Sequence, residues 1–372
     1  MSDPQPIKLF AFATQGAGGH DEARVRALLE NFQVDYFPFD RRARLRSFLR
    51  LLAAMRRGGY QLVVMEGSGI AGGAAVLLGR LLFAASYVLS SGDAVAPFLG
   101  ARVRLLRPVA SIYERLLYRS ASGFIGWTPY LTGRAISFGS PRAMTAAGWA
   151  PYRYDAGELA RSRVAARAEL GIPEDGLVAG IAGSLAWNKN VGYSYGLELV
   201  EAMRRCHRPD AYVLIIGEGE GRKRLERMAG DYLGSRIIFT GNVPRDRVPH
   251  YLAAMDIASL PQSVDQVGSV RYTTKLSEYL SVGLPIVTGR LPMAYDLDEG
   301  WLWRLPGKAP WDSCYIEALS ILIERLGPHE LIPKRSAALS RMREFDRERQ
   351  VSRTTDFIDD LLADRIDAHR NT

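Results

Sequence analysis

The sequence predicts an α/β fold in which two doubly wound domains are each built on a parallel β-sheet. The chain has 372 residues, which is too long for one ordinary hydrophobic core and suits two domains of roughly 150–200 residues each. Short apolar segments alternate with helical segments through the first half, and a second alternating series begins near Leu177. This alternation indicates parallel sheets that helices cover on both faces.

The first series supplies the first domain. Apolar runs predict strands at residues 7–14, 34–39, 61–66, 87–90 and 123–127. The spacing of apolar residues between them predicts helices at residues 21–31, 41–57 and 72–82. Because no basic leader with a cleavage site precedes the first strand, the start of the chain is interpreted as a strand rather than a signal peptide.

The second series supplies the second domain. Its predicted strands are residues 178–184, 212–219, 236–242, 257–262 and 284–289. Residues 147–175, which contain AGWAPYRYDAG and an Arg-rich helical turn, are interpreted as the interdomain connection. The predicted domains are therefore residues 1–155 and 156–347, and a last helix occupies residues 348–372.

The composition is that of a soluble globular protein, with 47% hydrophobic and 24% charged residues. Cys206 and Cys314 are far apart and form no metal-binding or redox spacing, which favours a reducing cytoplasm. The most apolar window, residues 70–89, contains Arg80 and several glycines. A membrane-spanning helix would have to hold that charge in hydrocarbon, so the window is interpreted as a buried helix that runs into a strand.

Basic residues are concentrated in the first half of the chain. Residues 1–170 contain 22 Lys and Arg against 12 Asp and Glu, whereas the remainder contains 26 against 28. The whole net charge of +8 therefore comes from the first half, which suggests that the N-terminal domain meets an anionic surface. Nucleic acid is not the expected partner, because no binding motif and no interleaved aromatic residues accompany the charge.

The predicted helix at residues 41–57 carries seven arginines in seventeen residues. Arg46, Arg50 and Arg57 line one face, and an apolar stripe between Leu45 and Met55 occupies another. A basic amphipathic helix of this kind can lie on anionic lipid. The alternative is that the stripe packs on the sheet and the arginine face is simply solvated.

Residues 271–287, RYTTKLSEYLSVGLPIV, predict a short helix followed by a buried strand. Thr273 or Thr274 can cap this helix, and a Gly and a Pro end it before the strand. Lys275 and Glu278 lie three residues apart on its first turns, where unpaired N–H groups attract anions. A cation and a carboxylate placed there suit a phosphate and a sugar hydroxyl. The alternative is an amphipathic helix whose Lys and Glu are solvated.

This segment resembles the donor-site helix of retaining glycosyltransferases with the GT-B architecture, family-4 type. Glu278 falls on the carboxylate with which that family holds the ribose of a nucleotide-sugar. Further family motifs precede it in the expected order, namely the Gly183 loop with Lys189, a turn from Gly217, FTGNVP and a strand ending at Pro261. The resemblance implies two Rossmann-like domains that face each other across a cleft.

The resemblance also implies cations for the leaving diphosphate. Lys189, in GSLAWNKN beyond Gly183, would contact the phosphates; the alternative is a solvated loop lysine. The family usually carries an Arg directly after this Gly, where the chain has Ser184, and Arg271 or Lys275 would substitute for it. Cations and helix amides can stabilise a diphosphate without a metal, so neither a metal nor another cofactor is expected.

A second departure from the family concerns its pair of acidic residues. The position eight residues before Glu278 is Val270, which cannot replace a carboxylate. Asp265, in DQVG, resembles the start of the usual pattern, with five additional residues inserted after it. Either Asp265 takes the first role and binds a donor-sugar hydroxyl, or it is a surface-loop residue. Asn242 and Val243 follow another strand, where relatives contact the nucleobase largely through the backbone.

Three candidates for the first domain follow its strands. In QGAGGH, after the first strand, glycines let the backbone approach a ligand, and the resemblance places Gly18 and Gly19 against the donor phosphates. His20 is a candidate base because imidazole titrates near neutrality; the alternative is a solvent-exposed residue at a helix start. Asp93, after the fourth strand, lies where α/β sheets bind ligands and is the preferred acceptor-side residue.

The resemblance therefore predicts a cytoplasmic glycosyltransferase that retains configuration and uses a UDP- or GDP-sugar donor. The second domain would bind the nucleotide, and the first would bind a saccharide or lipid-linked acceptor, at or near an anionic membrane. The last helix would cross back to cover the first domain, as in relatives. Two alternatives stay open: a non-catalytic GT-B binding protein, and a sugar-nucleotide epimerase or hydrolase on the same fold.

Overall fold

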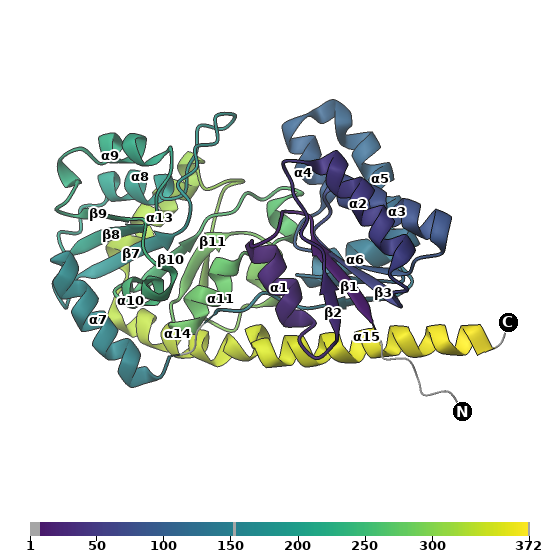
Figure 1. The fold of residues 1–372 in the computed structure, drawn as a ribbon. Helices are drawn as coiled ribbons and strands as arrows, with labels where there is room; N and C mark the ends of the chain where they lie inside the picture. The colour runs from purple at the N-terminus through teal and green to yellow at the C-terminus, as the bar shows by residue number, and fades with distance from the viewer. Residues whose placement is uncertain (1–7, 152–153, 371–372) are drawn as a thin grey trace. The chain divides into compact units, whose positions relative to one another are not determined.

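The computed structural model describes residues 8–151 and 154–370 of the chain. The chain divides into two compact units: Met1–Gly148 with Val270–Tyr272 and Asp346–Thr372, and Trp149–Ser269 with Thr273–Phe345. Each unit contains one six-stranded sheet, and neighbouring strands within each sheet run parallel (Figure 1). The predicted fold class is therefore confirmed.

The first sheet has the strand order β2-β1-β3-β4-β5-β6. Its strands are β1 (Leu9–Ala13), β2 (Val34–Tyr36), β3 (Leu62–Glu66), β4 (Tyr87–Ser91), β5 (Gly123–Gly126) and β6 (Ala143–Thr145). In register, Glu66 lies beside both Ala13 and Ser90, and Ser91 lies beside Gly126. The loops after β1, β3, β4 and β5 therefore leave the sheet at one edge, which is the edge where doubly wound folds bind ligands.

In the first unit, the connections between these strands contain the helices α1 (His20–Leu28), α2 (Arg44–Arg57), α3 (Ile70–Phe83), α4 (Val95–Arg102), α5 (Arg107–Ser120) and α6 (Pro129–Ser137). Helix α15 (Arg347–Arg370) is the C-terminal helix. Helix α3 packs against α2 and α5, whereas α1 packs against α15. The sequence did not predict α4 and α5, which have prolines in their first turns; a proline is compatible with that position because its N–H needs no partner there.

Residues 70–89 form a helix followed by a strand, as predicted, but the prediction that the helix is buried was wrong. Glycines let α3 approach its neighbours: a Cβ on Gly73 would lie 1.9 Å from the Tyr113 hydroxyl, and one on Gly79 would lie 2.9 Å from a methionine of α2. The large side chains face the other way, and Leu81 and Leu82 are exposed. Hydropathy alone could not reveal which face of α3 is buried, because small residues such as Gly73 and Gly79, and not the large apolar ones, contact the neighbouring helices.

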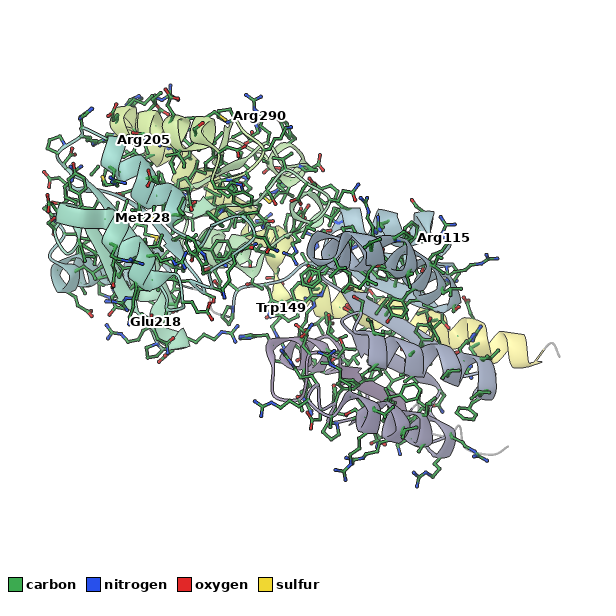
Figure 2. All side chains as sticks on the ribbon, turned by 90° about the horizontal axis from the view of Figure 1, so that it is seen from above. Arg115, Trp149, Arg205, Glu218, Met228 and Arg290 are labelled. Carbon is green, nitrogen blue, oxygen red and sulfur yellow. The ribbon has the colours of Figure 1, made fainter. Side chains whose placement is uncertain are left out.

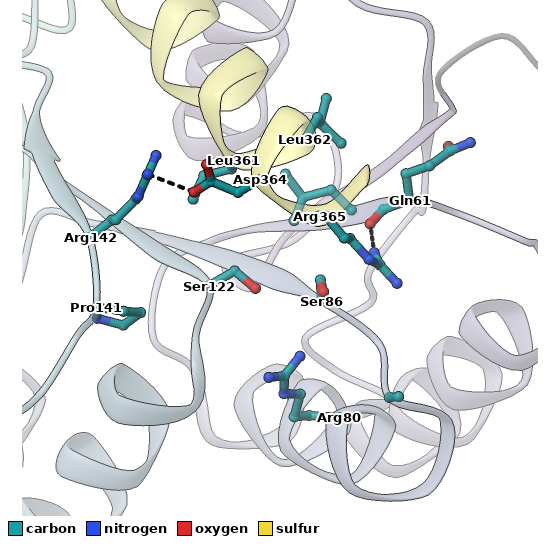
Figure 3. Close-up of a pocket in the computed structure, with 12 residues that line it drawn as sticks. Gln61, Arg80, Ser86, Ser122, Pro141, Arg142, Leu361, Leu362, Asp364 and Arg365 are labelled. Carbon is teal, nitrogen blue, oxygen red and sulfur yellow. Dashed lines mark hydrogen bonds and ion pairs between the residues drawn. The ribbon is translucent and has the colours of Figure 1, made fainter. Parts of the chain in front are cut away.

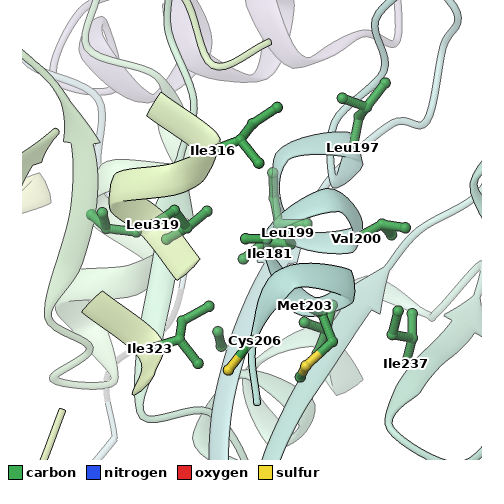
Figure 4. Packing of buried hydrophobic residues seen from close by; sticks show 14 of the residues in the cluster. Ile181, Leu197, Leu199, Val200, Met203, Cys206, Ile237, Ile316, Leu319 and Ile323 are labelled. Atoms are coloured by element: carbon green, nitrogen blue, oxygen red, sulfur yellow. The ribbon is translucent and has the colours of Figure 1, made fainter. Parts of the chain in front are cut away.

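The second sheet has the strand order β12-β11-β10-β7-β8-β9. Its strands are β7 (Leu177–Ala182), β8 (Ala211–Ile216), β9 (Ile237–Gly241), β10 (Ile257–Leu260), β11 (Ile286–Gly289) and β12 (Leu302–Leu305). The helices are α7 (Ala156–Leu170), α8 (Leu197–Arg205), α9 (Arg222–Ala229), α10 (Val248–Ala253), α11 (Thr274–Ser281), α12 (Met293–Asp296), α13 (Ser313–Arg325) and α14 (Pro328–Ser340). One core cluster joins the sheet to α8 and α13, where Ile181, Met203 and Leu319 are buried together (Figure 4).

Residues 156–170 form a helix of 15 residues, α7, where the sequence predicted only a helical turn within the connection. Asp155 caps it: its carboxylate accepts the Glu158 N–H at 2.8 Å, and the Glu158 carboxylate accepts the Asp155 N–H at 3.1 Å. The buried Arg167 donates to Asp256 at 2.8 Å. Helix α7 is therefore an integral part of the second unit.

Candidate functional site

In the second unit, Lys275 lies directly over the turn that follows β7. A Cβ added to Gly183 would lie 2.5 Å from the Lys275 Cε and 2.8 Å from its Nζ, so the absence of a side chain at Gly183 makes room for this lysine. The Lys275 Nζ also lies 4.4 Å from the centroid of the Tyr195 ring, within range of a cation–π interaction. In the described part of the chain, no carboxylate pairs with this ammonium. It can therefore bind an anionic ligand.

The turn at Gly183 and the turn at Gly217 pack directly against each other through their backbones. The Gly183 N–H donates to the Ile216 carbonyl at 2.8 Å, and the Leu185 N–H donates to the Glu218 carbonyl at 2.9 Å. A Cβ on Gly217 would lie 1.9 Å from the Gly183 oxygen, so no larger residue fits there without movement. The turns after β7 and β8 therefore form one rigid surface beside Lys275.

Glu278 occupies the same helix as Lys275 and is partly buried. Burial raises the pKa of its carboxyl group, while Lys275 and Arg245 lower it. Its carboxylate accepts no hydrogen bond from any residue in the described ranges. A partly buried carboxylate without a donor is costly unless a ligand supplies one. The hydroxyl of Tyr279 accepts the Ala182 N–H at 3.0 Å and fixes this helix against the end of β7.

Arg245, which sequence reasoning missed, follows β9 and is close enough to Glu278 to lower the pKa of its carboxyl group. Its position in the sequence could have identified Arg245 as a candidate site residue, because it directly follows FTGNVP in a loop at the carboxyl end of a strand. Asn242 is exposed in the same loop. A Cβ on Gly241 would lie 2.9 Å from the Arg222 guanidinium, which pairs with Glu218 at 2.5 Å. Glu218 is labelled in Figure 2.

Other predicted donor residues lie farther out. Ser184 and Lys189 are exposed, and Lys189 occupies the turn between the bridged residues Asn188 and Tyr193. No described contact joins Lys189 to Lys275. Thr274, the first residue of α11, is exposed as well. The prediction that Thr273 or Thr274 caps this helix was wrong, because Thr273 occupies the N-cap position and its side chain makes no capping hydrogen bond. The ligand roles of Thr274, Ser184 and Lys189 stay predictions.

Asp265 organises its own loop. One carboxylate oxygen accepts the Val267 and Gly268 N–H groups at 2.8 Å each, and the other accepts the Ser263 hydroxyl at 2.7 Å. These bonds fix the start of a short 3-10 helix at Gly268–Val270. They account for both carboxylate oxygens, and a role in binding a donor sugar stays a prediction.

The first unit includes Arg271, which pairs with Asp93. The Arg271 Nε donates to the Asp93 carboxylate at 2.6 Å, and a second guanidinium nitrogen lies 2.5 Å from the same oxygen. The Thr128 hydroxyl donates to the Val270 carbonyl at 2.8 Å and holds the segment in place. The structure thus brings together two residues to which the sequence assigned separate roles, on the donor side and the acceptor side.

A buried acidic cluster lies at the same edge of the first sheet. Glu66 is 1% exposed, accepts the Trp127 indole N–H at 3.0 Å and lies 3.8 Å from Arg24. Burial raises the pKa of Glu66 to about 7, although Arg24 lowers it. Burial and the neighbouring Asp93 raise the pKa of Asp21. The sequence analysis missed this cluster, whose only signal was a Glu that ends the apolar strand at residues 61–66.

The glycine loop after β1 is already engaged within the chain. The Gly18 N–H donates to the Glu22 carboxylate at 2.5 Å, and Glu22 also pairs with Arg26 at 2.7 Å. Although burial alone would raise it, these two contacts lower the pKa of Glu22. Gly19 precedes α1, and His20 is its exposed first residue. Binding of a phosphate at the Gly18 amide would therefore require Glu22 to move.

A cavity of about 450 Å³ lies at the opposite edge of the first sheet (Figure 3). It is lined by the residues that precede β4 and β5, including Ser86 and Ser122, and by Arg80 and Arg365. Helix α15 borders it through the pair of Asp364 with Arg142, at 2.6 Å. None of the site residues predicted from the sequence lines this cavity. Within the described ranges, no group of three His, Cys, Asp or Glu side chains could hold a metal ion.

Part of the second unit is similar in sequence to known glycosyltransferases. Residues 162–297 match the model of the family "Glycosyl transferases group 1". The 2-deoxystreptamine glucosyltransferase of Streptomyces kanamyceticus is 26% identical over 169 residues, which are 44% of this chain and 43% of that protein. The 2-deoxystreptamine N-acetyl-D-glucosaminyltransferase of Streptomyces fradiae is 30% identical over 101 residues, 27% of this chain and 24% of that protein. The chain therefore spans less than half the length of the curated relatives it matches.

Solved structures extend the similarity to the first unit. HepE of Anabaena, in complex with UDP, aligns with a TM-score of 0.69 and 16% identity over 95% of this chain and 100% of its own. Sucrose-phosphate synthase of Thermosynechococcus elongatus aligns with a TM-score of 0.72 and 16% identity over 96% of this chain and 99% of its own. The chain has the GT-B fold of glycosyltransferases. Its second unit contains the segment that matches group 1, which confirms the resemblance predicted from the sequence.

Proposed function

We propose that this protein is a retaining glycosyltransferase that transfers a sugar from a UDP-sugar to an acceptor. The observation that carries the proposal is the presence on one helix of the Lys275 ammonium, over the Gly183 turn, and the unpaired carboxylate of Glu278. A cation and a carboxylate acceptor together suit a diphosphate and a sugar hydroxyl. HepE, which shares the fold, forms complexes with UDP and with UDP-glucose.

The proposed chemistry depends on stabilising the leaving diphosphate. As the bond between the sugar and the diphosphate breaks, negative charge develops on the departing oxygen, and Lys275 can stabilise it beside the Gly183 turn. Lys189, exposed in the loop after β7, can supply a second cation. These groups can balance the charge without a metal ion, so we propose metal-independent transfer. Glu278 would accept hydrogen bonds from the ribose.

We propose that the first unit binds the acceptor, a saccharide or a lipid-linked saccharide, at the carboxyl edge of its sheet. Asp93 and Asp21 supply carboxylates that can accept hydrogen bonds from sugar hydroxyls. Because its pKa is about 7, Glu66 can exchange a proton near neutral pH and joins Asp93 and His20 as a candidate catalytic residue. The enzyme would work in the cytoplasm, peripherally at the inner face of the membrane.

Two other functions would use the same groups. A non-catalytic binding protein would hold the nucleotide-sugar at Lys275 and Glu278 without turning it over. A sugar-nucleotide epimerase or hydrolase would act on the donor without an acceptor. The departures from the family pattern at Ser184 and Val270 are the features that favour these alternatives.

Thermal unfolding in the presence of UDP, UDP-glucose, GDP and GDP-mannose tests donor binding. A ligand at one hundred times its Kd, bound only to the folded state, stabilises that state by about 2.7 kcal/mol. We expect UDP and UDP-sugars to raise the melting temperature. Stabilisation by GDP and GDP-mannose alone would indicate a GDP-sugar as the donor. If none of the four nucleotides stabilises the protein, the proposal is overturned.

Turnover then separates the three functions. The donor is incubated with and without candidate saccharide acceptors, and the products are separated by liquid chromatography. Transfer requires the acceptor and releases UDP together with a glycosylated product. Conversion of the donor without an acceptor would indicate an epimerase or hydrolase, and tight binding without conversion would indicate a binding protein.

A further inference from the structure

The exposed large hydrophobic residues of the described chain are concentrated in the first unit. Of the 21 large hydrophobic residues that are exposed, 13 lie between residues 45 and 116. The α3–α5 face is formed by six of these: Leu78, Leu81 and Leu82 on α3, and Val109, Ile112 and Leu116 on α5. The two helices pack against each other. Clustered apolar exposure of this kind usually marks an interaction surface.

Helix α2 extends this surface, in a way that the sequence pattern did not predict. Ser47, Leu51 and Met55 form its buried face. Leu45 and Leu49 are instead 71% and 58% exposed, so the prediction of a single apolar stripe from Leu45 to Met55 was wrong. The exposed leucines lie on the same helix as five of the seven arginines of the predicted basic segment, and the other two, Arg41 and Arg42, precede the helix.

The charge around the α3–α5 face is almost entirely positive. Residues 41–119 contain 13 Arg, no Lys and three acidic residues. Of these three, Glu66 and Glu114 are buried, and Asp93 pairs with Arg271. The following arginines are exposed and form no ion pair within the described part of the chain: Arg46, Arg50, Arg57, Arg80, Arg115 and Arg119. Figure 2 labels Arg115 on α5.

We propose that the α3–α5 face docks the protein on an anionic lipid bilayer. Its apolar side chains would enter the interface between headgroups and acyl chains, and the surrounding arginines would pair with lipid phosphates. The protein face has apolar side chains with unpaired arginines around them. An anionic bilayer is complementary to it, because its charged headgroups cover an apolar layer. No helix in the described ranges has the length and apolar run needed to cross a membrane.

The docking rests on the proposed function only through the acceptor, because a lipid-linked acceptor would lie in the same membrane. Binding to lipid does not require Lys275 or Glu278. Donor binding and vesicle binding can therefore be measured on the same protein, and either can fail without the other.

Sedimentation with vesicles tests the proposal. Vesicles of phosphatidylcholine alone are compared with vesicles that contain 30% phosphatidylglycerol. Each type is mixed with the full chain in 50 mM and 500 mM NaCl, because salt screens charge but not apolar insertion. The expected result is strong binding to the anionic vesicles at low salt, weaker binding at high salt and little binding to neutral vesicles.

Two sets of variants separate the contribution of the arginines to vesicle binding from that of the apolar side chains. Arg46→Ala, Arg50→Ala and Arg57→Ala, combined, should lower the partition coefficient about 100-fold at low salt, because each Arg near an anionic surface contributes roughly fivefold. The matched control combines Arg→Ala at Arg325, Arg349 and Arg353, which are exposed and have the same charge.

The apolar set combines Leu81→Ser, Leu82→Ser and Ile112→Ser, which should weaken binding at both salt concentrations because inserted apolar area is lost. Its control combines Ile321→Ser and Ile332→Ser, which are exposed on the second unit. Cooperative thermal unfolding without ligand, at a melting temperature close to that of wild type, serves as the readout that each variant is folded.

Several results would overturn the docking. The docking is refuted if wild-type protein stays in the supernatant at low salt. It is also refuted if the two control sets lose as much binding as the test sets. Self-association through this face, abolished by the apolar set and without vesicle binding, would assign the face to a second copy of the chain. If vesicle binding persists while UDP fails to stabilise the protein, the docking stands and the proposed function falls.

Discussion

Replacing Glu278 by Gln should weaken nucleotide binding and stabilise the free protein at the same time. The amide keeps the shape of the side chain but removes its charge. Hydrogen bonds to a charged group contribute about 1.5–3 kcal/mol and neutral ones about 0.5–1.5 kcal/mol, so the loss is on the order of 1–1.5 kcal/mol. That loss corresponds to a roughly tenfold weaker affinity for UDP.

The opposite effect on stability follows from the pKa of the same carboxyl group. Burial raises the pKa of Glu278 above its ordinary value of 4.5, so the ionised form destabilises the native state above that pH. Gln removes this penalty, and the melting temperature at neutral pH should rise. The gain should disappear as the pH falls below 4.5, where the wild-type carboxyl group is protonated in both states.

Isothermal titration with UDP and thermal unfolding at pH 4 and pH 7.5 measure both effects. Glu317→Gln, on the exposed side of α13, is the matched control and should change neither quantity. A Glu278→Gln variant that binds UDP as tightly as wild type would refute the assignment of this carboxylate to the ribose. A lower melting temperature would show that Glu278 has a structural partner.

Three further outcomes are expected. Lys275→Ala should weaken UDP binding roughly tenfold to hundredfold, and Lys189→Ala should lower turnover more than stability; full activity in both would place the diphosphate elsewhere. Burial raises the pKa of Glu66 to about 7, so wild-type stability should fall between pH 4.5 and 7, by up to about 3 kcal/mol, because the native state binds the extra proton. Glu66→Gln should flatten this profile in urea unfolding; an unchanged slope would contradict that pKa. Transfer should persist in EDTA, and loss restored by Mg²⁺ would refute metal independence.

The fold could be predicted to a large extent because parallel strands are buried on both faces. The segments IVTG at Ile286–Gly289 and LVVME at Leu62–Glu66 are mostly apolar in sequence and form fully buried strands in the structure. Residues 95–120 give no such signal, since α4 and α5 have prolines in their first turns and α5 exposes Val109, Ile112 and Leu116. An apolar run that faces solvent looks the same in sequence as one that faces the core.

The proposed donor site was more predictable than the proposed acceptor site for a related reason. Lys275 and Glu278 lie on one helix, so their spacing in sequence is their spacing in space, apart from the approach to Gly183. The acidic cluster around Glu66 joins loops that follow separate strands. Its members are dozens of residues apart, and only the register of the sheet brings them to one edge.

The pairing of Arg271 with Asp93 is the clearest limit of sequence reasoning in this chain. Each residue lies in a loop at a plausible ligand edge; Arg271 was assigned to the donor diphosphate and Asp93 to the acceptor. Their direct ion pair means that Arg271 must exchange one carboxylate for a phosphate before it can serve the donor. Such a pair can position Asp93 for an acceptor hydroxyl as readily as it can bind a diphosphate, and sequence spacing carries no information on that choice.

Of the five buried side-chain groups of the second unit that lack a hydrogen-bond partner within the described chain, two lie in the segment that leads to α11. The hydroxyl of Thr273, at the N-terminal end of α11, and the side-chain nitrogen of Gln262, after β10, are buried without a hydrogen-bond partner in the described chain. Native structures leave few such groups, and each costs about 1–3 kcal/mol. Two of them lie in the loops that lead to Lys275 and Glu278, where a bound diphosphate and ribose would bring both donors and acceptors. A polar ligand at the proposed site would satisfy these two groups, whereas Ser194, Tyr315 and Arg341 of the same unit lie outside this segment.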